Sequence, residues 1–207
     1  MAFTDADCIA DADWLRKIVQ PLDDASVGIV GGRNLAVPPC NGVERFGEAI
    51  HDNKRAIEVF RPPYVITMNW CSPREVLERV GLFDERFQGI DEDVDLSYRI
   101  GQAGYALVYQ PDAIVYHRNA STLPGLARKG FQHGFYSVQA RKRHRRLLVA
   151  LGHRQRVNGK AYVAIGSRLL DALRGVDRTE SLCDAVFNAA KKLGKAAGAV
   201  RFGSLDL

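Results

Sequence analysis

The chain has 207 residues, of which 46% are hydrophobic and 26% are charged, and its formal net charge at pH 7 is +5. This composition is that of an ordinary globular protein, with enough residues for one domain with a real core. It excludes a membrane-spanning helix, because no run approaches the roughly 18 consecutive apolar residues that such a helix needs. The N-terminus has neither the basic nor the apolar region of a secretory signal peptide.

The first part of the chain predicts a strand, a helix and a second strand. A buried strand is expected to end where the acidic segment Asp5–Asp7 begins. The helix that follows has Asp11 or Asp13 as its N-cap and ends at Pro21. The segment 26–37 is rich in β-branched residues and predicts the next strand.

The middle of the chain predicts three helices. The first has helical spacing over 43–59 and is stopped by the sequence "RPPY". A short helix begins at Pro73, a residue tolerated in the first turn, and ends at Gly81. The third helix covers 91–103.

The last part of the chain predicts two short strands, over 105–110 and 113–117, separated by a Pro-Asp turn. A basic helical region over 123–151 and an amphipathic helix over 179–199 follow. This order of elements predicts an α/β fold with helices packed on a mixed sheet.

The four cysteines are far apart and form no CxxC pair. They predict reduced thiols in a cytosolic protein rather than a disulfide framework or a zinc site; they are Cys8, Cys40, Cys71 and Cys183.

Charge is unevenly distributed along the chain. Acidic residues concentrate in 5–13 and 84–95, whereas 118–160 contains no acid. That division indicates an acidic pocket for a cation and a basic surface for an anionic partner; solvated helix and loop surfaces are the simpler alternative. The eleven cations of the acid-free stretch are Arg118, Arg128, Lys129, Arg141, Lys142, Arg143, Arg145, Arg146, Arg154, Arg156 and Lys160.

The first acidic motif is Asp5-Ala6-Asp7, at the end of the first predicted strand. In a segment of period two, both carboxylates point to one face. Two hard oxygen donors suit Mg²⁺ or Mn²⁺ carried on a diphosphate. The second copy, Asp11-Ala12-Asp13, is expected to serve as a helix N-cap instead.

The second acidic motif lies at the start of the helix predicted over 91–103. The helix dipole stabilises negative charge there, so acids at this position can be purely structural. That explanation does not account for four acids in five positions, and a carboxylate near a bound cation can act as a general base toward a hydroxyl. The acids are Asp91, Glu92, Asp93 and Asp95.

Four motifs in order resemble the second half of a family 2 glycosyltransferase of the GT-A fold. They are "FTDADC", "REVLERVGLFDERF", "EDVDLSYR" and "VYH", and the resemblance covers Ala2 to His144. It implies a partial GT-A, Rossmann-like mixed sheet with flanking helices over residues 1–120. A helical basic extension is expected over 121–207.

The resemblance also implies roles for individual residues. Asp5 and Asp7 match the aspartates that hold a divalent ion, Mg²⁺ or Mn²⁺, on the nucleotide-sugar diphosphate, and His117 matches a histidine that completes this site in some members. Asp93 matches the general base of inverting members, and Glu92 would orient the acceptor.

Three further residues lie where the family binds its substrates. They are Asn69, Trp70 and Asp91; Trp70 would stack on a sugar ring or belong to the core. Arg99, in contrast, is expected to form an i,i+4 ion pair with Asp95.

The resemblance implies that the nucleotide-binding half of the domain is absent from this chain. We therefore expect an N-terminal truncation, a half supplied by another chain, or a degenerate remnant of the enzyme, and little or no transferase activity from the 207 residues alone. Robust turnover by this chain would contradict that expectation.

The implied partners are a nucleotide-sugar donor and a sugar or lipid-linked acceptor, in the synthesis of cell-surface polysaccharide or glycolipid. The basic segment 139–146, "QARKRHRR", also resembles a nucleic-acid patch or a membrane-surface helix. No nucleic-acid motif accompanies it, so we expect no nucleic-acid partner but a cytoplasmic protein with peripheral contact at the inner face of a membrane. A non-catalytic binding module descended from the enzyme is the alternative function.

Overall fold

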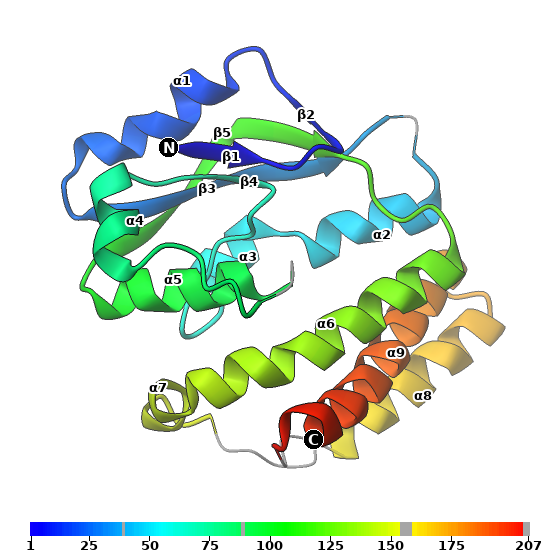
Figure 1. The fold of residues 1–207 in the computed structure, drawn as a ribbon. Coiled ribbons are helices and arrows are strands. Elements are labelled where there is room, and N and C mark those ends of the chain that lie inside the picture. Colours follow the sequence, from blue (N-terminus) through cyan, green and yellow to red (C-terminus); the bar gives the residue numbers. More distant parts are fainter. Residues whose placement is uncertain (39, 88–89, 154–158, 205–207) are drawn as a thin grey trace. The chain divides into compact units, whose positions relative to one another are not determined.

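The structure is a computed structural model that describes residues 1–38, 40–87, 90–153 and 159–204. The chain forms two compact units (Figure 1). One unit comprises 1–38 and 48–118, and the other comprises 39–47 and 119–207.

The first unit is built on a mixed five-stranded sheet, which confirms the predicted α/β class. The strand order is β1-β4-β3-β5-β2, in which β3 and β5 are parallel and the other neighbours are antiparallel. The strands are β1 (Ala2–Thr4), β2 (Cys8–Ala10), β3 (Val27–Ala36), β4 (Asn69–Cys71) and β5 (Ala106–His117).

Two features of this sheet differ from the sequence-based expectation. The strands predicted on either side of Pro111 are one strand, β5, whose register against β3 shifts where Gln110 pairs with Gly32 and Ile114 pairs with Arg33. Proline is tolerated at such an irregularity because it need not donate to the ladder. The short strands β2 and β4 were not predicted.

Helices cover both faces of this sheet. Ile18 of α1 (Trp14–Val19) packs on one face with Val27, Val30 and Cys71. The opposite face carries the larger core cluster, in which Trp70 lies. The helices that contribute to this cluster are α3 (Asn53–Glu58), α4 (Arg74–Val80) and α5 (Glu92–Gln102). Adjacent residues of β4 point to opposite faces, as a strand requires.

The boundaries of the helices in the middle of the chain follow local rules, although one predicted helix is divided in two. Pro73 is the N-cap residue of α4 and Gly81 ends it at φ +87°, as predicted. The helix predicted over 43–59 is instead two helices, α2 (Gly42–Ile50) and α3. The break arises because the Asp52 side chain accepts a hydrogen bond from the Arg55 backbone N–H and so starts a new helix.

The second unit is helical. It contains α6 (Leu123–Arg143), α7 (Arg145–Ala150), α8 (Gly159–Leu173) and α9 (Arg178–Phe202). Helix α8 was not predicted, and two cations of the basic stretch, Arg154 and Arg156, lie outside the described residues. Among the described helices, none combines the length and the apolar character needed to cross a bilayer.

Four glycines allow α6 and α9 to approach backbone to backbone. A Cβ atom added at Gly134 would lie 2.0 Å from the carbonyl oxygen of Lys191, and one added at Gly194 would lie 2.0 Å from that of Phe131. Gly130 and Gly198 make similarly close approaches, to Phe187 and Phe135. Backbone atoms cannot move aside as flexible side chains do, so the interface requires glycine at these positions.

Replacing Gly134 with alanine is therefore expected to destabilise the chain by about 3 kcal/mol, the upper part of the range for overpacking. The matched control is Gly166→Ala on α8, where an added Cβ meets nothing within 4 Å. That change should stabilise by about 0.5–1 kcal/mol because alanine favours helix. Urea unfolding followed by circular dichroism measures both, and equal effects of the two changes would contradict this account of the interface.

Candidate functional site

The first acidic motif lies in the turn that joins β1 to β2. The turn is closed by the Cys8 N–H, which donates to the Asp5 carbonyl over 3.1 Å. The Arg118 N–H donates to the Asp7 carbonyl over 3.1 Å and ties the turn to the end of β5. The sequence predicted that strand periodicity would put Asp5 and Asp7 on one face. In the structure the two residues lie in a turn instead, so strand periodicity does not position them.

Pairing of β2 with β5 brings Asp7 to His117. Cys8 lies opposite His117 in the register of the two strands. The Nε2 atom of His117 is 3.5 Å from Oδ1 of Asp7. The Asp7 side chain is 55% exposed, whereas that of His117 is 5% exposed and its ring packs edge-on against His51.

Asp7, His117 and Cys8 together form a possible cation site. One ligand atom from each lies within 4.8 Å of the others. Burial raises the pKa of the Cys8 thiol, and the charges of Asp5 and Asp7 add to that effect while hydrogen bonds oppose it. A carboxylate oxygen and an imidazole nitrogen are ligands suited to a divalent cation. Asp5 is outside this group of three.

The second acidic motif lies at the start of α5. Asp91 is the N-cap residue, at φ +65°. The carboxylate of Asp93 accepts the Val94 N–H at 2.7 Å and the Thr67 N–H at 3.4 Å. Desolvation raises the pKa of Asp93 well above its ordinary value, and the charges of Glu92 and Asp91 raise it further.

The two acidic motifs are close enough for their charges to interact. The pKa of Glu92 is raised, first by burial and also by the negative charge of Asp5. Both motifs belong to the first unit. The structure thus places the start of α5 near the turn after β1, although about 85 residues separate the motifs in the sequence.

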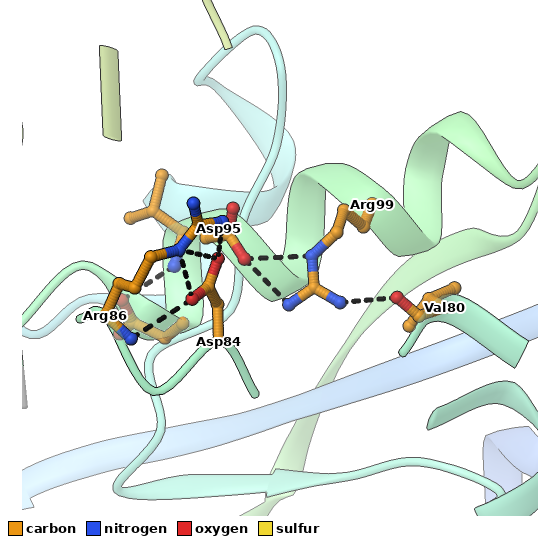
Figure 2. A network of polar contacts seen from close by, with 7 residues as sticks. Val80, Asp84, Arg86, Asp95 and Arg99 are labelled. Carbon is orange, nitrogen blue, oxygen red and sulfur yellow. Dashed lines mark hydrogen bonds and ion pairs between the residues drawn. The ribbon is translucent and has the colours of Figure 1, made fainter. Parts of the chain in front are cut away.

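Asp95 has a structural role that separates it from the other three acids. Its side chain is fully buried and binds Arg99 through Oδ2, which lies 2.8 Å from Nε and 2.7 Å from Nη2 (Figure 2). Arg99 also donates from Nη1 to the Val80 carbonyl at 2.6 Å. The predicted i,i+4 ion pair is confirmed.

The two residues of β4 predicted to bind substrate are buried instead. Asn69 accepts a hydrogen bond from Trp14 Nε1 and donates to the carbonyls of Arg33 and Ala113, so its amide connects strands and α1. Trp70 is 1% exposed and stacks on Phe3 at 4.4 Å between ring centroids. In this structure both side chains hold the sheet together and are inaccessible to a sugar.

The segment 64–67 lies against the acids at the start of α5, which was not recognised from the sequence. Burial raises the pKa of the Tyr64 phenol, and the charges of Asp93 and Asp91 raise it further. Thr67 contacts both Asp93 and Glu92. The signal available was the "RPPY" sequence, which predicted only the end of a helix.

The comparisons with known proteins agree with these motifs. The family model described as "Glycosyltransferase like family 2" matches residues 1–134. The chain is 32% identical over 143 residues to the pre-mycofactocin glycosyltransferase of Mycobacterium tuberculosis, which covers 65% of this chain and 30% of that protein. It is 28% identical over 141 residues to glycosyltransferase AglE of Haloferax volcanii, covering 67% of this chain and 45% of AglE.

A shorter match and a solved structure complete the comparison. Over 47 residues the chain is 49% identical to the N-acetylglucosaminyl-diphospho-decaprenol L-rhamnosyltransferase of M. tuberculosis, covering 23% of this chain and 15% of that protein. The mannosyltransferase PcManGT from Pyrobaculum calidifontis, solved with GDP-Man and Mn²⁺, has a TM-score of 0.50 at 19% identity, covering 93% of this chain and 61% of that one. The chain thus spans less than half the length of these curated relatives.

Proposed function

This chain belongs to glycosyltransferase-like family 2, whose model matches residues 1–134, and we propose that it transfers a sugar from a nucleotide-sugar donor to an acceptor hydroxyl. The observation that carries the proposal is the approach of two acidic motifs within one unit, seen in the effect of the Asp5 charge on Glu92. One motif faces a histidine, and the other carries a carboxylate with a raised pKa.

Asp7 and His117 would hold a divalent cation, Mg²⁺ or Mn²⁺, with Asp5 beside them. When bound, such a cation supplies positive charge that stabilises a diphosphate leaving group. Their donor set fits this use, since a carboxylate oxygen and an imidazole nitrogen already lie 3.5 Å apart. The relative solved with GDP-Man and Mn²⁺ is consistent with this assignment.

Asp93 is the general base in this proposal. One of its carboxylate oxygens takes the proton of the acceptor hydroxyl as that oxygen forms a bond to the anomeric carbon. The bond from the anomeric carbon to the diphosphate breaks, and its electron pair leaves with the diphosphate. Attack from the side opposite the leaving group inverts the anomeric configuration. A raised pKa makes Asp93 a stronger base than an ordinary aspartate.

The remaining acids would position the acceptor. Glu92 lies next to Asp93 and contacts Thr67, and Asp91 lies at the N-cap of the same helix. Hydrogen bonds from acceptor hydroxyls to these carboxylates would hold the reacting hydroxyl near Asp93. We infer a sugar or lipid-linked acceptor, in synthesis of cell-surface polysaccharide or glycolipid, because one relative is named for a diphospho-decaprenol substrate.

The cation assignment predicts that Asp7→Asn weakens Mn²⁺ binding at least about tenfold, since it removes a charged ligand. Isothermal titration and the paramagnetic resonance of free Mn²⁺ both measure this without turnover. The matched control is Asp13→Asn in the second Asp-Ala-Asp copy, where Asp13 is exposed and pairs with Arg16 at 3.2 Å. Equal binding by both variants would rule out the site at Asp7.

The proposed function itself is tested by Asp93→Asn in a polypeptide that includes a nucleotide-binding half, where sugar transfer should fall at least about a hundredfold while the chain stays folded. The alternative, a non-catalytic module descended from the enzyme, predicts that this substitution changes no measured property except stability.

A further inference from the structure

Helix α8 exposes a continuous apolar face. Val163 is 74% exposed and Leu173 is 84% exposed. The apolar face of α8 is defined here by Tyr162, Val163, Leu169, Leu170 and Leu173. At 100° per residue these side chains, with Gly166 between them, span about a third of the helix circumference. Large apolar side chains exposed in one stripe usually mark an interaction surface.

The opposite face of α8 packs on α9. Ala172 is buried there. Arg168 forms an ion pair with Asp184 of α9 at 3.8 Å, and the ammonium of Lys192 lies 5.2 Å from the Tyr162 ring centroid. Figure 1 shows α8 alongside α9 within the helical unit. Among the described residues, the apolar face of α8 therefore contributes little to the packing of the helical unit, and Tyr162 at its edge contacts Lys192.

Cations border the apolar face of α8. Lys160 on α8 and Arg174, directly after its last residue, are exposed, and the helical rotation puts Lys160 beside Val163, on the flank away from α9. On the other flank is Lys192 of α9, which lies over the Tyr162 ring. The only acid of α8 is Asp171, which is half-buried next to Ala172.

We propose that the apolar face of α8 docks on an anionic lipid surface. Apolar side chains of an amphipathic helix enter the boundary between headgroups and acyl chains, while flanking Lys and Arg meet lipid phosphates. A second copy of the chain fits less well, because face-to-face pairing of two such helices brings together the cations that border each stripe. Nucleic acid would leave the apolar residues without a partner.

This surface differs from the one expected from the sequence. The basic segment 139–146 ends α6 and begins α7. Its cations are not accompanied by a stripe of apolar residues comparable to that of α8, although Val149 and Leu151 near α7 are exposed. The combination of an apolar stripe and bordering cations therefore shifts the proposed lipid contact to 159–174.

The test is flotation of the full chain with vesicles of phosphatidylglycerol and phosphatidylcholine. Wild type should bind these vesicles, bind less in high salt, and bind pure phosphatidylcholine weakly. The double variant Val163→Asp, Leu170→Asp should lower the partition coefficient at least about tenfold, because it removes two inserted side chains and adds two negative charges. Val200→Asp on α9, where the valine is 86% exposed, is the matched control and should bind as wild type does.

Circular dichroism must show the same helix content in all three proteins, as expected for changes at exposed positions. The proposal is overturned if wild type does not bind the anionic vesicles or if the double variant binds them as well as wild type does. It is also overturned if sedimentation shows a dimer that the double variant abolishes while vesicle binding persists. Because none of these measurements uses turnover, failure here leaves the proposed transferase function untouched, and transfer to a water-soluble acceptor tests that separately.

Discussion

Replacing Asp93 with asparagine is expected to lower sugar transfer by about a hundredfold to ten-thousandfold, the range typical for loss of a general base. The amide nearly matches the carboxylate in shape, and its one oxygen can still accept the Val94 N–H, whereas the NH2 group replaces the oxygen that accepts the longer bond from the Thr67 N–H. It cannot take a proton from a hydroxyl. The loss should therefore appear in the rate of transfer, with little change in donor binding.

The same substitution is expected to stabilise the folded chain at neutral pH. Desolvation and the charges of Glu92 and Asp91 raise the pKa of Asp93 above its ordinary value of 3.8. The folded state then binds more protons than the unfolded state, so stability falls as pH rises from the ordinary pKa to the raised one, and it stays lower above that. Asparagine has no charge to desolvate and removes this cost. Lower activity with higher stability is the signature of a functional residue, since a structural residue would lose stability.

Transfer is measured by mass spectrometry of the product, with the 207-residue chain and with any longer polypeptide encoded in the same reading frame. Stability comes from urea unfolding at pH 5 and pH 8. Asp112→Asn, at an exposed position of β5, is the control and should change neither quantity. A variant Asp93→Asn that transfers at the wild-type rate would exclude Asp93 as the base and favour the binding-module alternative.

An element could be predicted from the sequence where neighbouring residues determine it, and could not be predicted where it depends on contacts with distant segments. The ends of α4 follow from Pro73 and Gly81 alone, and α5 follows from its acidic first turn, so both were predicted. Helix α8 was missed although its apolar spacing is helical, because its large side chains face outward and glycines occur within it. The course of β5 across Pro111 depends on pairing with β3, which local sequence does not show.

The candidate site, too, could be predicted only where neighbouring residues determine it. The motifs identified the acids, but the meeting of Asp7 with His117 depends on pairing of β2 with β5. The burial of Trp70 depends on Phe3 in the neighbouring strand β1. Tyr64 comes near Asp93 only because the loop before β4 lies against the start of α5. Such non-local contacts decide whether a residue lies in the candidate site or in the core, and the sequence signals of the two kinds of residue are the same.

Removing the Arg99 side chain is expected to destabilise the fold strongly. Arg99→Met leaves the carboxylate of Asp95 buried without the guanidinium that contacts its Oδ2 atom, and leaves the Val80 carbonyl without its donor (Figure 2). Breaking a buried ion pair from one side costs about 3–5 kcal/mol. We expect the lower end, because Arg86 also interacts with Asp95: the pKa of Arg86 is raised chiefly by Asp84 and further by the charge of Asp95.

Arg74→Met is the matched control, since Arg74 and Glu78 form a pair at the same i,i+4 spacing but in solvent, where the loss should be at most about 1 kcal/mol. The double variant Asp95→Asn, Arg99→Met should recover much of the loss, because no buried charge remains. Urea unfolding of wild type, Asp95→Asn, Arg99→Met and the double variant gives the coupling energy. If Arg99→Met lowers the free energy of unfolding no more than Arg74→Met does, the burial of the Asp95 carboxylate does not depend on its pair with Arg99. Asp95 would then not be the carboxylate that fixes α5 to the end of α4. Its role would no longer differ from that of Asp93, the base that destabilises the fold.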